Sequence, residues 1–192
     1  LEDPKGRRIM IGWLGNWAHK DTPARVDGWQ GMMSLPRKLS LSGLNLVSEP
    51  VEELALLRGK SMLAGKAIPD KREWVDIPAA ETVDLEAQLR VPVQGKGIFE
   101  IQLRCSEDGR RVVRVGYEAA RDRVFIERMG LEKGPREPAE GPGRREKGKV
   151  QVRIVLDKSS VEVFAGRPAT SSLTTMIFPD PIDRGIRYRA TG

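Results

Sequence analysis

The amino-acid sequence predicts an all-β protein whose main part is an antiparallel β-sandwich of two sheets. Three observations support this prediction. Apolar and polar residues alternate with a period of two over much of the chain, turn-forming residues separate these runs, and only one short stretch has helical spacing. The 192 residues are 39% hydrophobic and 31% charged, which is typical of one substantial globular domain with a small appendage.

The first predicted strand, residues 9–14, differs from the others because neither of its faces is polar. One face carries Ile9, Ile11 and Trp13, and the other carries Met10, Gly12 and Leu14. That pattern predicts a strand buried on both sides, inside something larger than this chain. The start of the chain has neither Met nor the basic and apolar segments of a signal peptide, so we interpret it as a cut end. Whether the parent protein is secreted or cytoplasmic is therefore left open.

A short helix is predicted over residues 50–58. Pro50 stands at its start, two glutamates follow in the first turn, and Arg58 precedes Gly59 at its end. The apolar positions 51, 54 and 57 share one face. About two turns of helix would therefore connect the N-terminal part of the chain to the sandwich.

Three later runs predict strands with one apolar and one solvated face, as in antiparallel sheets. They cover residues 85–93, 98–104 and 150–156. In the second run Phe99, Ile101 and Leu103 face one way, and Glu100, Gln102 and Arg104 face the other. Turns are predicted at Ser42-Gly43, Gly95-Lys96-Gly97, Asp108-Gly109 and Asp157 to Ser160, after which Val161 and Val163 resume the alternation.

Residues 130–149 have a different composition. Glycine, proline and charged residues dominate, and Leu131 is the only large apolar residue. Such a segment buries too little apolar surface to offset the entropy of ordering it. We predict a mobile loop between two strands here; a functional lid is the alternative.

Composition excludes several kinds of site. Cys105 is the only cysteine and His19 the only histidine, so an intrachain disulfide and a thiolate or multi-histidine metal centre are excluded, and a serine–histidine triad would depend on His19 alone. We therefore predict no metal and no cofactor. The net charge is +6, but arginines alternate with acids instead of forming basic runs, so we expect no nucleic acid partner. No apolar run approaches the roughly 20 residues of a membrane helix, and we expect no membrane partner.

Five segments of the chain carry motifs whose order along the sequence is informative. They are Asp3 to Trp17, which contains Gly6-Arg7-Arg8-Ile9; Trp29 to Leu39, which contains Ser34-Leu35-Pro36-Arg37; Pro50 to Arg58; Gly116-Tyr117-Glu118 with Val124-Phe125-Ile126; and Arg153 to Phe164 with Thr174 to Pro179. In this order they resemble the closing third of a glycoside hydrolase of family 32. That family hydrolyses β-fructofuranosyl linkages in sucrose, sucrose phosphate, inulin or levan and retains the anomeric configuration.

The resemblance implies a five-bladed β-propeller followed by a β-sandwich. Residues 1–40 would then be the last strands of the final propeller blade, residues 41–58 a connector with the short helix, and residues 59–192 the C-terminal sandwich. The missing N-terminal propeller would be the partner of this chain, and fructan or sucrose the substrate of the whole enzyme. A homo-oligomer is a further hypothesis, because a detached blade would expose Ile9, Ile11 and Trp13.

Retention requires two carboxyl groups about 5–5.5 Å apart, a nucleophile and an acid/base. The resemblance implies an aspartate in an Asn-Asp-Pro motif, a second in Arg-Asp-Pro and a glutamate in Glu-Cys. None of these motifs occurs here: Arg121-Asp122 is followed by Arg123, and Cys105 follows Arg104. We therefore predict no catalytic residue in this chain and expect it to be inactive alone, whereas its parent is expected to be a glycosidase.

The tryptophans are the candidates for contact with substrate. The resemblance implies that a tryptophan in this part of the propeller lines the fructose pocket, so Trp13 and Trp17 are the candidate substrate-binding residues, with Trp13 preferred because it follows the predicted buried strand directly. Packing in the core or an interface is the alternative for both. Trp29 is predicted to pack in the seam between the domains, and Trp74 in the sandwich or at its rim.

Two functions from other classes remain as alternatives. The sandwich could be an independent, lectin-like carbohydrate-binding module for fructans, which predicts an exposed aromatic platform. Lys158 and Ser159 could form a Ser-Lys catalytic pair, but residues 157–160 have the composition of a turn and offer no base-orienting partner. The leading hypothesis is a structural role: the sandwich covers and stabilises the propeller.

Overall fold

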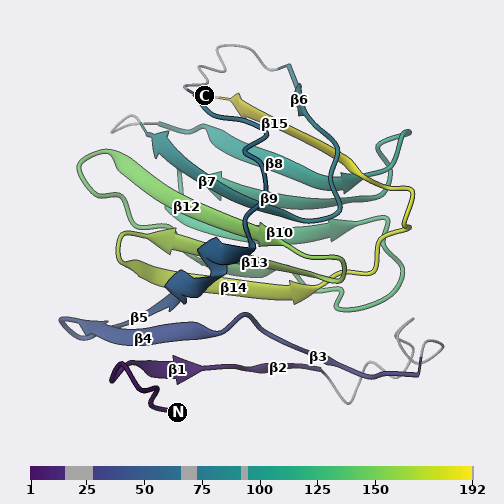
Figure 1. The fold of residues 1–192 in the computed structure, drawn as a ribbon. Helices are drawn as coiled ribbons and strands as arrows, with labels where there is room; N and C mark the ends of the chain where they lie inside the picture. Colours follow the sequence, from purple (N-terminus) through teal and green to yellow (C-terminus); the bar gives the residue numbers. More distant parts are fainter. Residues whose placement is uncertain (16–27, 66–72, 92–94, 192) are drawn as a thin grey trace.

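The computed structural model describes residues 1–15, 28–65, 73–91 and 95–191 of the chain. Two antiparallel sheets face each other and enclose the core, and a small N-terminal group of strands lies beside one of them (Figure 1). The predicted all-β sandwich is therefore confirmed.

The larger sheet has six strands in the order β11-β10-β9-β8-β15-β6. Adjacent strands all run antiparallel, and β15, the C-terminal strand, is inserted between β6 and β8. The six strands are β6 (Val75–Ile77), β8 (Ile98–Cys105), β9 (Val112–Glu118), β10 (Arg123–Met129), β11 (Ala139–Pro142) and β15 (Gly185–Thr191).

The smaller sheet of the sandwich has four strands in the order β14-β13-β12-β7. The strands are β7 (Val83–Arg90), β12 (Lys149–Leu156), β13 (Ser160–Gly166) and β14 (Ala169–Met176). The turn between β12 and β13 is closed by the Asp157 amide, which donates to the Ser160 carbonyl at 2.9 Å. The turn predicted for these residues is thus confirmed.

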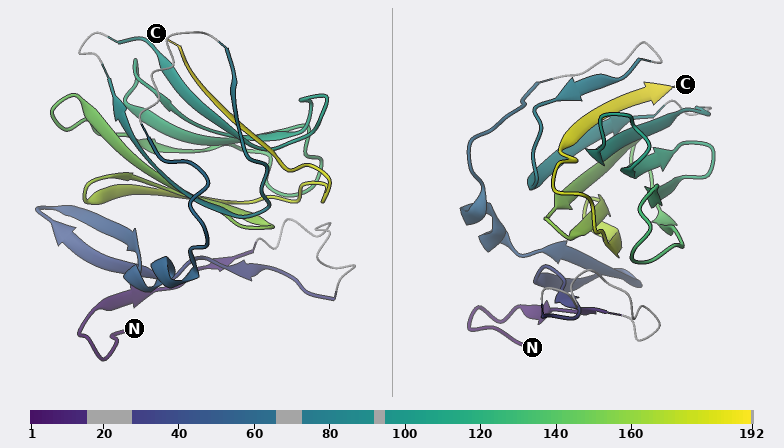
Figure 2. Two further views of the ribbon diagram at one scale, coloured as in Figure 1. Left: turned by 45° about the horizontal axis from the view of Figure 1, so that its top comes forward. Right: turned by 90° about the vertical axis from the view of Figure 1, so that its right-hand side faces the viewer.

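The N-terminal strands lie on the β14 side of the sandwich, away from the six-stranded sheet (Figures 1 and 2). β5 contacts β14 directly. A three-stranded sheet, β1-β4-β5, is continued by the two-stranded ribbon β2-β3. Their bounds are β1 (Arg8–Met10), β2 (Trp13–Leu14), β3 (Met32–Met33), β4 (Arg37–Ser42) and β5 (Asn45–Pro50).

The predicted short helix is present as a 3-10 helix, η2 (Glu52–Leu57), between β5 and the sandwich. None of its own residues is buried, whereas Val51 just before it is. In a 3-10 helix residues three apart eclipse each other, so this short connector has no room for a broad apolar face.

The core lies between the two sheets of the sandwich. Alternate residues of β8, β9 and β10 meet alternate residues of β12 and β13, and almost all are aliphatic. The largest contributors that are fully buried include Ile101, Leu103, Ile126, Ile154 and Leu156. Each such side chain contributes about 1.5–3 kcal/mol on burial, so this double layer supplies most of the driving force for folding.

The polar face predicted for residues 98–104 is not solvated. Glu100, Gln102 and Arg104 are all buried, although they lie on the face of β8 opposite to Ile101 and Leu103. Arginines from the neighbouring strands reach over this face and pair with the carboxylate of Glu100. Local alternation correctly separates the two faces, but long neighbouring side chains cover the polar one.

The loop predicted over residues 130–149 is only partly a loop. Residues 139–142 form β11, which pairs with β10 at the edge of the large sheet. A strand needs only backbone hydrogen bonds, which glycine supplies without an apolar side chain. Gly141 also lets β11 approach β14, because a Cβ at this position would stand 2.6 Å from the Ser171 hydroxyl.

Within this chain, residues 9–14 are not buried on both faces, since Met10, Ile11 and Trp13 are exposed. Their burial inside a larger protein stays a prediction. In the described parts of the chain, no helix has both the length and the apolar character needed to cross a membrane.

Gly116 provides a test of packing on the large sheet. It lies opposite Phe125 on β10, and a Cβ at Gly116 would come within 2.3 Å of the Phe125 ring and 2.8 Å of the Phe99 carbonyl. We predict that Gly116→Ala lowers the free energy of unfolding by about 1–3 kcal/mol through overpacking. Urea denaturation measures the change. Gly59→Ala, at an exposed position with open space, is the control and should change stability by less than about 0.5 kcal/mol; equal effects would contradict the prediction.

Candidate functional site

The seam between the N-terminal strands and the sandwich is built around one buried ion pair. Arg37, the first residue of β4, reaches Glu162 in the middle of β13. The side chains of Arg37 and Glu162 are only 8% and 2% exposed. The guanidinium donates to the carboxylate through two nitrogens, Nε at 3.2 Å and Nη2 at shorter range. The two residues are 125 positions apart in sequence.

Other groups of the small sheet complete the surroundings of Arg37. Its guanidinium also donates to the hydroxyls of Ser172, at 3.2 Å, and Thr174 on β14. It lies over the ring of Phe164, with the Cζ atom 5.2 Å from the ring centroid. A buried ion pair is tolerated only when its remaining donors and acceptors are satisfied. Here β13 and β14 together form a socket for the arginine.

The second oxygen of Glu162 holds the main chain just before β4. Its Oε1 accepts a 2.6 Å hydrogen bond from the Leu35 amide. The neighbouring Ser34 is buried and bonds to Gly12 in both directions: its amide donates to the Gly12 carbonyl at 2.7 Å, and the Gly12 amide donates to its hydroxyl at 2.9 Å. A continuous set of contacts therefore runs from the sandwich to the residue before Trp13.

Trp13, a candidate substrate-binding residue, lies on β2 opposite Met33 of β3. Two glycines make space for its indole. A Cβ at Gly31 would lie 2.2 Å from the indole Nε1, and one at Gly15 would lie 2.1 Å from Cζ2. The side chain lies close against the backbone but is still 48% exposed. The exposed part of the indole offers a flat apolar surface of the kind that a sugar ring can contact.

The other tryptophans are distributed as follows. Trp17, the second candidate, and His19 lie outside the described residues. Trp29 is 39% exposed, and its packing in the seam stays a prediction. Trp74 stands next to β6 at the rim of the large sheet, with the guanidinium carbons of Arg187 and Arg189 at 4.7 and 4.3 Å from its ring centroid. The rim position predicted for Trp74 is confirmed.

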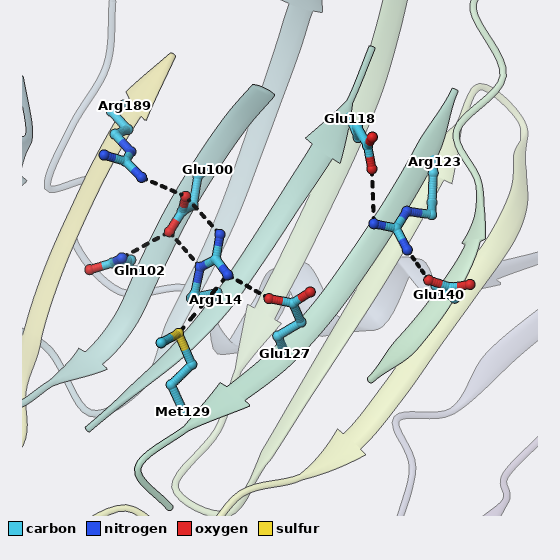
Figure 3. Close-up of polar contacts among 9 residues, drawn as sticks. All are labelled: Glu100, Gln102, Arg114, Glu118, Arg123, Glu127, Met129, Glu140 and Arg189. Carbon is cyan, nitrogen blue, oxygen red and sulfur yellow. Dashed lines mark hydrogen bonds and ion pairs between the residues drawn. The ribbon is translucent and has the colours of Figure 1, made fainter. Parts of the chain in front are cut away.

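The outer face of the large sheet carries a lattice of acids and arginines on β15, β8, β9, β10 and β11 (Figure 3). At its centre Glu100 accepts from Arg114 Nε at 2.8 Å and from Arg189 at 3.2 Å. Arg114 continues to Glu127 on β10 at 2.5 Å. Further along, Arg123 bridges Glu118 on β9, at 2.8 Å, and Glu140 on β11. These ion pairs join each of the five strands to the next.

Aromatic rings on this face are covered. Phe125 is buried and lies under the guanidiniums of Arg114 and Arg123, at 5.7 and 5.6 Å from the ring centroid. Trp74 is stacked in the same way by two arginines. Among the described residues the exposed large hydrophobic side chains include only two aromatic ones, Trp13 and Trp29, and neither belongs to the sandwich. The sandwich therefore lacks, in its described part, the aromatic platform that a fructan-binding module requires.

The buried acids of the described chain are all engaged by arginines. They are Glu100, Glu162 and Asp183, of which the last accepts from Arg111 at 2.7 and 2.8 Å. Burial by itself would raise the pKa of Glu100, but hydrogen bonds from Arg114 and Gln102 prevail and lower it. A general acid needs a carboxyl whose pKa is raised. The Glu100 carboxylate therefore suits a structural role.

In the described chain, neither the Cys105 thiol nor the residue types that bind metals are arranged for catalysis. Burial raises the pKa of Cys105 to about 11, which leaves the thiol protonated and unreactive near neutral pH. Within residues 1–15, 28–65, 73–91 and 95–191, no group of three or more His, Cys, Asp or Glu side chains is placed to hold a metal ion.

The pairing of Arg37 with Glu162 could not be predicted from the sequence pattern. Glu162 alternates with Val161 and Val163, which is the usual pattern of a strand with a solvated face. The available signal was Phe164, two residues further on the same face, because a large apolar residue there indicates that the face is covered. The covering strands lie more than 100 residues earlier, so periodicity could not identify them.

Two protein-family models match this chain. The model for the glycosyl hydrolase family 32 C-terminal domain matches residues 53–192, and the model for the family's N-terminal domain matches residues 1–50. The chain belongs to glycosyl hydrolase family 32. The N-terminal strands, β1 to β5, thus correspond to the end of the family's N-terminal domain, and the sandwich corresponds to its C-terminal domain.

Curated relatives support this assignment. A levanase of Bacillus sp. (strain L7) is 33% identical over 203 residues, which covers 98% of this chain and 21% of that protein. A sucrose-6-phosphate hydrolase of Zymomonas mobilis is 28% identical over 188 residues, covering 94% of this chain and 35% of that protein. The chain thus spans about a fifth to about a third of the length of these two relatives.

Solved structures share the fold. The exo-inulinase of Aspergillus awamori superposes with a TM-score of 0.78 at 25% identity, over 97% of this chain and 38% of the other. A β-fructofuranosidase of Bombyx mori superposes with a TM-score of 0.71 at 24% identity, over 98% and 38% of the two chains. Both likenesses run through the N-terminal strands as well as the sandwich.

We predict that Glu162→Ala lowers the free energy of unfolding by about 3–5 kcal/mol, because it leaves the Arg37 guanidinium buried without its counter-charge. Glu86→Ala removes a half-exposed partner of Arg58 and serves as the matched control. Its cost should be about 0–1 kcal/mol. Urea denaturation of both variants tests the prediction, and a cost for Glu162→Ala as small as that of the control would refute it.

Acid should destabilise the chain through its paired carboxylates. Glu100 has a folded-state pKa below its ordinary value, so its contribution is present above an unfolded pKa of about 4.3 and is lost as pH falls through the lower folded value. We predict that the free energy of unfolding decreases from pH 6 to pH 3 and that Glu100→Gln reduces this slope. Glu137→Gln, at an exposed position, is the control; an unchanged slope in Glu100→Gln would contradict the assignment.

Proposed function

We propose that this chain is the C-terminal part of a retaining β-fructofuranosidase that cleaves fructan or sucrose, and that its sandwich supports the catalytic propeller. The names of its relatives point to this substrate class: a levanase, a sucrose-6-phosphate hydrolase and an exo-inulinase. The observation that carries the supporting role is the Arg37–Glu162 pair, which fixes the end of the N-terminal domain in a socket of the sandwich.

The chemistry is proposed to lie upstream of Leu1. The buried carboxylates of the described chain are paired with arginines, whereas retaining hydrolysis needs a free nucleophile and a protonated acid. The chain alone is therefore expected to be inactive. The missing propeller would be its partner, and it would cover the exposed apolar residues of the N-terminal strands, which include Met10, Ile11 and Met33.

Trp13 is proposed to contact the fructosyl unit of the substrate. It has an exposed indole held against two glycines on the N-terminal strands, on the part of the chain that would complete the propeller. Stacking of the indole on the apolar face of a sugar would hold the ring. Trp17, outside the described residues, is kept as a second candidate on sequence grounds alone.

The alternative, an independent fructan-binding module, has no observation in its favour, because the aromatic rings of the large sheet lie under arginines. Calorimetry of the purified chain with levan and inulin tests it. We expect no heat of binding; saturable binding would support the module.

We predict that the purified 192-residue chain releases no fructose from sucrose, inulin or levan. Protein expressed from the coding sequence extended upstream of Leu1 should release fructose from at least one of them, because the extension would supply the carboxylate pair. Fructose release is measured with both proteins under the same conditions. Activity of the chain alone would overturn the proposal. An active protein whose upstream extension carries no pair of catalytic carboxylates would overturn it as well.

A further inference from the structure

The two carboxylate oxygens of Glu162 accept hydrogen bonds from different donors. Oε2 accepts from the Arg37 side chain, while Oε1 accepts from the Leu35 main-chain amide at 2.6 Å. The first contact holds a side chain. The second fixes the path of the backbone immediately before β4, and it does so from a residue of the sandwich that is 2% exposed.

Ser34 links this segment of backbone to Gly12 on the neighbouring segment through hydrogen bonds. Its hydroxyl accepts from the Gly12 amide at 2.9 Å and donates to the Leu35 carbonyl at 3.1 Å, while its amide donates to the Gly12 carbonyl at 2.7 Å. Ser34 is buried, so water does not compete for these bonds. Gly12 is therefore held on both its backbone groups by one residue.

The ribbon that carries Trp13 begins at the next residue. β2 and β3 pair at only two positions, Trp13 with Met33 and Leu14 with Met32. A two-stranded ribbon of this length has little stability of its own. Its place relative to the sandwich is consequently set by the residues at its base, Gly12 and Ser34.

We propose that Glu162 is a positioning residue: acting through Leu35, Ser34 and Gly12, it sets the place of the Trp13 indole. The sandwich would then do more than support the propeller. One of its carboxylates would align the aromatic surface on which the fructosyl unit rests. This inference rests on the proposed role of Trp13 for its functional meaning, but the positioning itself can be observed without any sugar.

The test uses the 192-residue chain labelled with 5-fluorotryptophan and observed by fluorine NMR. Trp13→Phe assigns the Trp13 resonance, and the Trp74 resonance in the sandwich serves as an internal reference. Ser34→Ala removes the acceptor of the Gly12 amide and leaves the ion pair intact. Glu162→Gln keeps one acceptor oxygen, which cannot serve both Leu35 and Arg37. Ser172→Ala is the matched control, because it removes a hydroxyl that contacts Arg37 without lying on the path to Gly12.

We expect Ser34→Ala and Glu162→Gln to shift and broaden the Trp13 resonance and leave that of Trp74 in place, while Ser172→Ala changes neither. A Trp13 resonance that stays unchanged in Ser34→Ala, or that moves equally in Ser172→Ala, overturns the positioning role. Ser34→Ala carries the test even if Glu162→Gln does not fold, since it introduces no unpaired charge.

A second measurement separates this inference from the proposed function. In the upstream-extended protein, Trp13→Ala and Ser34→Ala should each raise KM for the fructan about tenfold, the change that corresponds to about 1.4 kcal/mol of lost binding, with kcat less affected. The double variant should be no worse than Trp13→Ala alone. If Trp13→Ala leaves KM unchanged, the proposed sugar contact fails while the NMR result still decides the positioning. If KM rises in Trp13→Ala but not in Ser34→Ala, the positioning fails and the sugar contact stands.

Discussion

The pairing of Arg37 with Glu162 is the constraint on which the arrangement of this chain depends. The pair joins β4 to β13. The Arg37 guanidinium also contacts two hydroxyls of β14 and the Phe164 ring, which complete its socket. Replacing a buried ion pair by apolar residues is often neutral or stabilising, so such a pair contributes more to geometry than to stability. An apolar contact would tolerate sliding along the seam. A guanidinium that must meet a carboxylate and two hydroxyls tolerates only one register.

The large sheet of the sandwich is stabilised by different interactions on its two faces. Inside, aliphatic residues from both sheets form a dry layer that supplies the hydrophobic driving force. Outside the large sheet, the Glu100 and Arg123 lattices link each strand to its neighbour by charge-assisted hydrogen bonds (Figure 3). Arg114, Arg123 and Arg189 thereby serve as crosslinks between strands. They also leave little open aromatic surface for a sugar.

Periodicity predicted the strands well where the information was local. The alternation at residues 150–156 falls within β12, and its apolar positions, Val150, Val152, Ile154 and Leu156, are all buried. Tertiary contacts decided the rest. Burial of Glu100 depends on arginines from β9 and β15, and β11 forms from a glycine- and proline-rich segment because an unpaired edge of β10 is available. The family motifs located Trp13, but they did not show that its position depends on Ser34 and, beyond it, on a glutamate of the sandwich.

The wide separation of Arg37 and Glu162 along the chain has an evolutionary consequence. Any recombination event with a junction between them would unite an arginine from one ancestor with whatever the other ancestor carries at the glutamate position. Unless both parents already held matching partners, the hybrid would inherit a lone buried ion and fold poorly. The two regions should therefore be transmitted as a unit, and grafting a foreign sandwich onto a related propeller should succeed only when donor and recipient agree at both positions.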